Sequence, residues 1–364
     1  MNLSEILRNL CLAPAPSGYE REAARVYRDA VAAFVDSVEV DRAGNTIATI
    51  QGTDPKAPSV MVFAHLDQLG FIVRRIEPDG FLQIDRLGGI PEKVLPALEL
   101  LIRTRSGEFV PGVIGIKSHH ATAAEEKYKV DPVTSLFVDV GCASADQVRE
   151  LGIEIGAPAI YKSRFQPLPN GKVSATAIDD RGGVAALALA ASLLRQNRPA
   201  ARVSLVGSVW EEFNIRGAVH AARALQPDIA ICVDVILAGD TPDLKNRYNN
   251  ALGAGPSVNL YSFHGRGTLN GTIPHEGLVR LMERAAGENS IPLQRFASLG
   301  ILTDSAYVQM EGKGIACVDL GFPVRYTHTP AELCATSDIE NLAKLIAAGV
   351  GMIDSGFDCR RYTL

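Results

Sequence analysis

Short apolar segments alternate with helical segments along most of this 364-residue chain, and the alternation limits the folds it can adopt. Segments 60–64, 203–209 and 229–233 have the length and composition of buried strands, whereas 181–194 and 217–225 have the character of helices. When strands and helices alternate in this way, the strands pair in one sheet and the helices cover both of its faces. The sequence therefore predicts an α/β fold with a mixed, largely parallel sheet sandwiched by helices.

Residues 70–164 differ in texture from the rest of the chain. Stretches with β character recur there, and turn sequences rich in Pro, Asp, Ser and Gly separate them. We therefore expect a β-rich inserted domain over 70–164, between the two parts of a larger domain at 1–69 and 165–364. Two histidines in this insertion, His119 and His120, are expected in an exposed loop.

Two segments carry signatures of helix starts. Ser17, with Glu20 three residues later, fits a capping box for a helix that follows. The segment 337–340 is expected to cap the last helix of the chain. Both segments are therefore expected to mark where helices begin.

Composition and charge exclude several classes of protein. Lys and Arg total 36 against 41 for Asp and Glu, a net charge of −5, whereas a general nucleic-acid binder is normally basic. The longest small-apolar run, 185–194, is about half the ~20 residues that span a bilayer. The six cysteines are scattered and the chain starts without a secretory signal, so we expect reduced thiols in a cytoplasmic protein, with no nucleic-acid or membrane partner.

Side chains that bind metals or move protons gather at the ends of the predicted strands. In an open α/β sheet, the carboxyl ends of the strands form the edge where sites lie. Each of these residues alone suits an ordinary polar strand end or a helix N-terminus. Because five separate segments bring such residues to one edge, the sequence predicts a shared site made of His65, Asp67, Asp179, Asp180, Glu211, Glu212, Asp234 and His328.

These residue types suit a site for two divalent cations. Imidazole and carboxylate ligands without thiolate are typical of Zn, Co or Mn. One carboxylate can bridge two ions about 3.5–4 Å apart, as in aminopeptidases and phosphatases. A second carboxylate has to stay off the metals to move protons, and the pair Glu211 and Glu212 can supply it. Asp67, two residues after His65, is placed to orient its ring.

Several different short motifs follow one another in a defined order over nearly the whole chain. They are Ala15-Pro16-Ser17-Gly18, Ala64-His65-Leu66-Asp67, Ala177-Ile178-Asp179-Asp180-Arg181-Gly182-Gly183, Glu211-Glu212 with Arg216-Gly217-Ala218, Thr303-Asp304-Ser305-Ala306 and Arg325-Tyr326-Thr327-His328-Thr329-Pro330. Together they resemble the dinuclear metallo-aminopeptidases of the tetrahedral (TET) and glutamyl, or deblocking, aminopeptidase type. Some members of that family carry an endoglucanase label. The resemblance implies a zinc-peptidase-like catalytic domain at 1–69 and 165–364, and a β-barrel-like oligomerisation domain at 70–164.

The resemblance also implies roles for individual residues. It implies a cis peptide between Asp179 and Asp180, and dimers that build a tetrahedral dodecamer. The family usually has a glycine where this chain has Asn214, a residue that also tolerates positive φ. The implied metal ligands are His65 and Asp234 on one ion, Glu212 and His328 on the other, and Asp179 between them, with Glu211 as general base and Asp67 as a catalytic residue.

The expected activity is release of N-terminal residues from peptides by metal-activated water. Asp304 is expected either to position the substrate or to cap a helix. A related metallohydrolase acting on another amide remains an alternative. Glycoside hydrolysis is a weaker one, because Glu211 and Glu212 are adjacent and poorly placed to flank a sugar at about 5–9.5 Å. A scaffold with an idle site would have lost ligand positions, and this sequence keeps all five.

Overall fold

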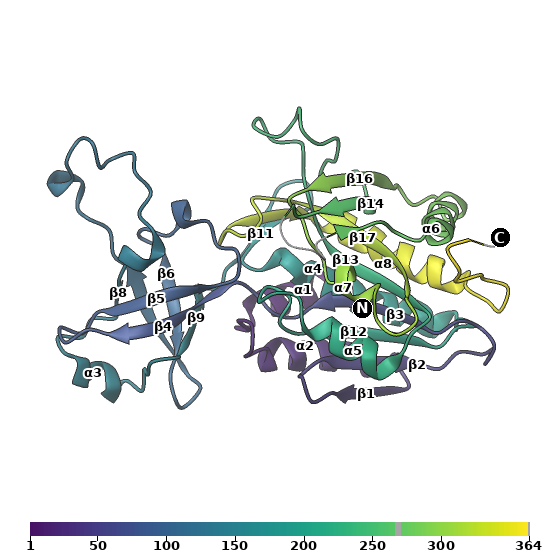
Figure 1. The fold of residues 1–364 in the computed structure, drawn as a ribbon, viewed down its shortest axis with the longest axis horizontal. Coiled ribbons are helices and arrows are strands. Elements are labelled where there is room, and N and C mark those ends of the chain that lie inside the picture. Colours follow the sequence, from purple (N-terminus) through teal and green to yellow (C-terminus); the bar gives the residue numbers. More distant parts are fainter. Residues whose placement is uncertain (266–270, 363–364) are drawn as a thin grey trace.

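The computed structural model describes residues 1–265 and 271–362, which form a large sheet with helices on both faces and a smaller barrel beside it (Figure 1). In the described chain the large sheet has twelve strands. Nine of them follow one path: β1 (Ser37–Val40), β2 (Thr46–Ile50), β12 (Val203–Ser208), β3 (Val60–His65), β13 (Ile229–Leu237), β17 (Ala316–Arg325), β18 (Glu332–Ala335), β11 (Lys172–Ala175) and β10 (Phe165–Leu168). Three more lie off this path: β14 (Ser257–Phe263) pairs with β17, and β15 (Gly271–Thr272) and β16 (Gln294–Leu299) pair with β14.

Antiparallel pairs outnumber parallel pairs among the described strands of this sheet, so the expected mixed α/β fold is confirmed but "largely parallel" was wrong. Strands β12, β3, β13 and β17 pair in parallel, and β14 pairs in parallel with β16. The other pairs are antiparallel, because hairpins and short returning strands extend both edges. Parallel pairing requires long crossovers, and these connect the central strands and also join β14 to β16 by way of β15 and α6.

Alternate residues of the central strands face different layers of helices. On β3, Val60 and Val62 belong to one apolar core, and Met61 and Phe63 belong to another. The first core is formed with α1 (Leu3–Leu12), α2 (Arg21–Val31), α4 (Ile178–Gln196), α6 (Glu276–Glu288) and α8 (Thr336–Gly351). The second is formed with α5 (Gly217–Leu225) and α7 (Ser305–Val308). The prediction of a sheet covered by helices on both faces is therefore confirmed.

Helix α4 lies at the centre of the larger core. It is rich in Ala and Leu, and its residues from Ile178 to Ala188 are buried on all sides. Small side chains let it pack against β3, β13 and α8. Among the described helices, none is long and apolar enough to cross a membrane.

Six strands close into a barrel that stands apart from the large sheet (Figure 1). Their order is β4 (Gly70–Ile76), β5 (Leu82–Leu87), β8 (Val138–Asp139), β7 (Phe109–Ile114), β6 (Glu99–Arg103) and β9 (Pro158–Tyr161). The barrel has its own apolar core, which includes Phe71, Ile84 and Leu100. The short helix α3 (Ala145–Glu150) and the 3-10 turns η1 (Glu92–Val94), η2 (His119–Ala121) and η3 (Val133–Ser135) complete it. His119 and His120 are exposed, as predicted.

The two predicted capping segments have other partners. Ser17 does not cap α2; its hydroxyl donates to a buried carboxylate 50 residues away. Asp338 accepts the backbone N–H groups of Gly253 and Gly255, 2.7 and 2.9 Å away, and α8 starts without a side-chain cap. Both capping predictions were wrong, because each side chain has a partner far away in the sequence: Ser17 donates to Asp67, and Asp338 accepts from the Gly253–Gly255 backbone.

Candidate metal centre and active site

The five predicted metal ligands come from five separate segments of the large sheet and its helices. His65 ends β3, Glu212 follows β12, and His328 lies between β17 and β18. Asp179 lies in the first turn of α4. Asp234 was expected after a strand but lies inside one, because β13 continues to Leu237 in register with β17.

The structure brings these five side chains together. In the described part of the chain, two groups of residues have ligand atoms that all lie within 4.8 Å of one another. One group is His65, Asp179 and Asp234, and the other is Asp179, Glu212 and His328. Asp179 therefore belongs to both groups and lies between them.

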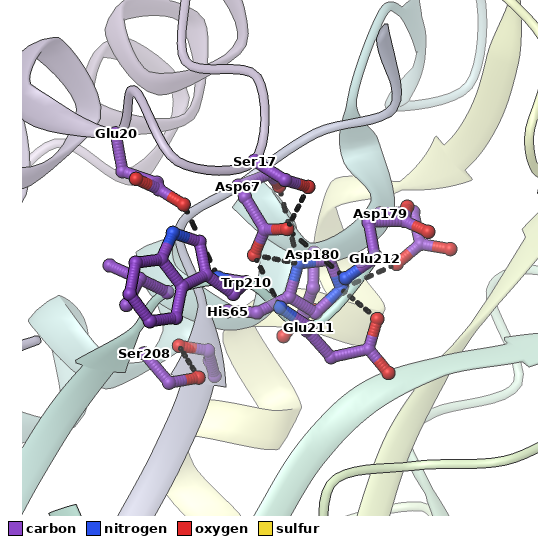
Figure 2. Close-up of polar contacts among 12 residues, drawn as sticks. Ser17, Glu20, His65, Asp67, Asp179, Asp180, Ser208, Trp210, Glu211 and Glu212 are labelled. Atoms are coloured by element: carbon purple, nitrogen blue, oxygen red, sulfur yellow. Dashed lines mark hydrogen bonds and ion pairs between the residues drawn. The ribbon is translucent and has the colours of Figure 1, made fainter. Parts of the chain in front are cut away.

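The two oxygens of Asp179 face two different histidines. Its Oδ1 lies 3.1 Å from His65 Nε2, and its Oδ2 lies 3.7 Å from His328 Nε2. The peptide bond between Asp179 and Asp180 is cis, as the resemblance implied. Figure 2 shows Asp179 beside Glu212 and Asp180.

Both histidines present the same nitrogen to the cluster. His65 Nδ1 lies 3.2 Å from the backbone oxygen of Asp67, and His328 Nδ1 lies 2.8 Å from that of Gly89. Because a carbonyl oxygen can only accept, each Nδ1 carries the hydrogen and the neutral ring has its lone pair on Nε2. Histidines that bind metals through one ring nitrogen commonly donate the hydrogen of the other nitrogen to a backbone carbonyl in this way.

The charges of the cluster favour a bound cation. Burial raises the pKa of Glu212 to about 7, although His328 opposes the shift. Burial, followed by repulsion from Asp179, raises the pKa of Asp234 well above its usual range. Crowded carboxylates of this kind become stable as anions when a cation lies among them. The donor set of imidazole and carboxylate therefore fits divalent cations.

Glu211 lies beside the cluster but belongs to neither group among the described residues. Its Oε2 is 3.9 Å from His65 Nε2, and it lines the same pocket as Asp179 and His328, which has a volume of about 460 Å³. Burial raises the pKa of Glu211 well above its usual range. This carboxylate is therefore free to exchange protons next to the cluster.

Asp67 is a buried acceptor that connects several parts of the site (Figure 2). Its carboxylate accepts the backbone N–H groups of Glu211 and Glu212, each 3.0 Å away, and the hydroxyl of Ser17 at 2.6 Å. Burial alone would raise the pKa of Asp67, but contact with His65 and these hydrogen bonds hold it below its usual range. Asp67 thus fixes the loop that carries both glutamates, a contact that sequence reasoning missed.

Glu20 supports the same loop from outside. Its Oε1 accepts the backbone N–H of Gly18 at 2.6 Å and that of Trp210 at 3.2 Å. Trp210 and Asn214 have positive φ angles of 60° and 67°, so the loop needs such support. The tolerance expected of Asn214 is confirmed.

Glu332 is a buried carboxylate that the sequence prediction missed. One oxygen accepts the backbone N–H of Asp179 at 3.0 Å, and the other accepts that of His328 at 2.8 Å. Burial, and then repulsion from Asp179, raises the pKa of Glu332 to about 8. The sequence signal that could have identified Glu332 is an acidic residue at the start of a short apolar strand, β18.

Asp304 is buried and stands at the N-cap position of α7. Its Oδ2 accepts the hydroxyl of Ser208 at 3.3 Å, and its side chain makes no cap bond to α7. Among the described residues that line the pocket, Asp304 is absent. The expected side-chain cap of α7 is therefore absent, and a role of Asp304 in positioning the substrate stays a prediction.

Comparisons with known proteins agree with this geometry. SgcX of Escherichia coli (strain K12) is 38% identical over 98% of this chain and 95% of that protein. The aminopeptidase APDkam598 from the archaeon Desulfurococcus kamchatkensis has a TM-score of 0.91 and 29% identity, covering 97% of this chain and 95% of that one. The TET1 peptidase of Pyrococcus horikoshii, which can assemble into a tetrahedron or a large octahedral shell, has a TM-score of 0.83 and 27% identity, covering 95% of this chain and 98% of that one. The sequence pattern of the M42 glutamyl aminopeptidases matches residues 44–345, and the chain therefore belongs to that family.

Proposed function

We propose that this protein is a metal-dependent aminopeptidase that releases N-terminal residues from peptides with a free amine. The observation that carries the proposal is the position of Asp179, with one oxygen toward His65 and the other toward His328. A carboxylate shared between two sets of ligands suits the paired metals of hydrolases that cleave peptide bonds. Membership of the M42 family supports the same activity.

The proposed cofactors are two divalent cations per subunit. Zn, Co and Mn all accept imidazole and carboxylate ligands. When bound, such cations lower the pKa of water and polarise the carbonyl of the scissile peptide bond. The residues that would hold them are His65 and Asp234 for one ion, Glu212 and His328 for the other, and Asp179 for both.

Glu211 is the general base in the proposed reaction. Its carboxylate accepts a proton from the attacking water, whose oxygen bonds to the scissile carbonyl carbon. Glu211 then gives this proton to the amine nitrogen as the carbon–nitrogen bond breaks, which regenerates the carboxylate. The carboxylate of Asp67 accepts the backbone N–H of Glu211 and so holds Glu211 in place, and it lies beside the ring of His65.

Glycoside hydrolysis receives little support from the same geometry. It needs two carboxyl groups on either side of a sugar, with one free to protonate the leaving oxygen. Glu212 lies instead with Asp179 and His328 in one candidate metal group. A metallohydrolase that acts on another amide can be distinguished from an aminopeptidase by testing which substrates the enzyme cleaves.

We further propose that 70–164 is an inserted oligomerisation domain between the two parts of a catalytic domain at 1–69 and 165–364. Its barrel stands apart from the large sheet (Figure 1). Exposed apolar side chains of the inserted segment include Ile116 and Tyr128, between β7 and β8. The TET1 peptidase can assemble into a tetrahedron or a large octahedral shell, and PhTET1-12s is a dodecamer. Similarity to these structures supports our proposal that this chain assembles from dimers into a tetrahedral dodecamer.

Hydrolysis of matched peptides with free and acetylated N-termini tests the proposed function. The metal-supplemented enzyme is expected to cleave only the free peptide and to lose activity in chelator. Glu211→Gln keeps the shape of the side chain but removes the base, so kcat should fall by roughly a hundredfold or more while bound metal is unchanged. Cleavage of the acetylated peptide, or loss of metal from Glu211→Gln, would contradict the proposal.

A further inference from the structure

The pocket beside the candidate metal centre has an apolar wall that the proposed chemistry does not use. Its volume is about 460 Å³, and the apolar side chains that line it are Ile215, Val235, Leu237, Ile301 and Leu302. Resting on the proposed function, we propose that this wall selects peptides whose N-terminal residue has an apolar side chain and rejects acidic and basic ones.

Two residues of the apolar wall are near neighbours in sequence of the candidate metal ligand Asp234 and of the proposed base Glu211. Val235 follows the candidate ligand Asp234 on β13, and Ile215 donates its backbone N–H to the backbone oxygen of Glu211 at 2.8 Å. In a peptide substrate, the first side chain is attached to the carbon between the free amine and the scissile carbonyl. A substrate bound at the metal centre must therefore place that side chain in this pocket.

Charged groups that could pair with a substrate side chain are few around the pocket. Among the described lining residues none is Lys or Arg, and each Asp or Glu belongs to the metal centre or is the proposed base. His264 lines the pocket but is exposed. Since transfer of an unpaired charge out of water is costly, the wall disfavours a substrate carboxylate and a substrate ammonium alike.

Two nearby arginines are engaged away from the pocket. Arg325 makes two hydrogen bonds to Asp240, at 2.8 and 2.6 Å. The guanidinium of Arg216 lies over the ring of Phe213, 5.0 Å from its centre. Neither side chain lines the pocket, so neither is available to a substrate carboxylate. Although its family is described as glutamyl aminopeptidases, the described lining of this pocket holds no Lys or Arg that could pair with a glutamate side chain.

Initial rates on aminoacyl p-nitroanilides test the inference in the metal-supplemented wild-type enzyme. The kcat/KM for leucyl and methionyl substrates should exceed that for glutamyl and lysyl substrates by about tenfold or more. Equal or higher kcat/KM for the glutamyl or lysyl substrate would overturn the inference, and loss of that activity in His264→Ala would identify the responsible group. Absence of activity on every substrate would instead contradict the proposed function.

A pair of matched variants tests the wall itself. Leu302→Arg places a cation in the pocket and should raise the glutamyl-to-leucyl ratio of kcat/KM about tenfold or more. Leu299→Arg makes the same change at a side chain that is 61% exposed and outside the pocket, so its ratio should stay that of the wild type. An equal effect of both variants would overturn the inference, and the wild-type panel decides it alone if Leu302→Arg does not fold.

Discussion

At the scale of single residues, Asp67 links three segments that are distant in sequence. It lies beside His65, holds the backbone of both glutamates, and accepts the hydroxyl of Ser17. Because it is fully buried, each of these donors depends on it for a partner. The position of Glu211 therefore depends on a buried carboxylate that belongs to neither candidate metal group among the described residues.

Substitution of Asp67 should lower activity more than substitution of Ser17. Asp67→Asn turns one acceptor into a donor that faces N–H or O–H groups, so kcat should fall about 10- to 100-fold. Ser17→Ala removes one of the hydrogen bonds to Asp67 and leaves both backbone bonds, so its loss should be smaller. Steady-state kinetics at saturating metal measure both effects.

Ser192→Ala is the matched control, because the Ser192 hydroxyl donates to the backbone of Leu189 in α4. Its kcat should equal that of the wild type. If Ser17→Ala lost as much activity as Asp67→Asn, the hydroxyl and not the carboxylate would hold the loop.

The candidate ligand residues could be predicted at this scale, but the residues that hold them in place could not. His65 and Asp179 stand out because a strand end and a helix start carry groups that suit metals. Glu332 and the backbone oxygen of Gly89 act through contacts that span long stretches of sequence. Ser17 was misassigned as a helix cap because a local pattern matched and its real partner lies 50 residues away.

At the scale of elements, the loop that carries the two glutamates is closed at its base. Gly217 N–H donates to the backbone oxygen of Val209 at 2.9 Å. Asn45 connects the same two residues: its amide donates to the Gly217 oxygen and its Oδ1 accepts the Val209 N–H. A Cβ on Gly217 would lie 2.0 Å from the Val209 oxygen, so only glycine fits there.

Gly217→Ala should therefore disturb both stability and catalysis. Separation of the two backbones should lower the free energy of unfolding by about 1–3 kcal/mol and reduce kcat, because Glu211 lies inside the loop. Urea denaturation and peptide hydrolysis measure the two effects.

Gly287→Ala provides the comparison, since a Cβ at this helical glycine meets nothing within 4 Å. It should leave activity unchanged and raise stability by up to about 1 kcal/mol. Equal behaviour of the two alanine variants would show that the loop base tolerates a side chain.

The bounds of elements with a strong hydrophobic periodicity were predicted well, whereas the bounds of strands that depend on pairing with a neighbouring strand were not. The α5 prediction matches its bounds, and β13 was expected to end at Val233 but continues to Leu237. Pairing with β17 extends β13 past Asp234, and the sequence of one strand carries no information about the length of its neighbour. The short strands β10, β11 and β18 exist only as partners at the sheet edge.

At the scale of the whole molecule, the large sheet and the barrel both contribute to the candidate site. The backbone oxygen of Gly89, in the segment after β5, accepts the Nδ1 hydrogen of His328. The proposed oligomerisation domain therefore touches a candidate metal ligand. Sequence texture predicted where the β-rich segment lies, but not that it reaches the site.

The proposed assembly has a mass that can be measured. Twelve copies of a 38.9 kDa chain give roughly twelve times that mass in sedimentation equilibrium at micromolar concentration. A dodecamer would agree with the proposed role of 70–164. A monomer at all concentrations would contradict it and leave the catalytic proposal standing.

Anomalous diffraction from crystals grown with Zn or Mn tests the shared position of Asp179 most directly. We expect two peaks about 3.5–4 Å apart. One should lie beside His65 and Asp234, the other beside Glu212 and His328, with Asp179 contacting both. A single peak, or two peaks of which one has no contact with Asp179, would contradict the account.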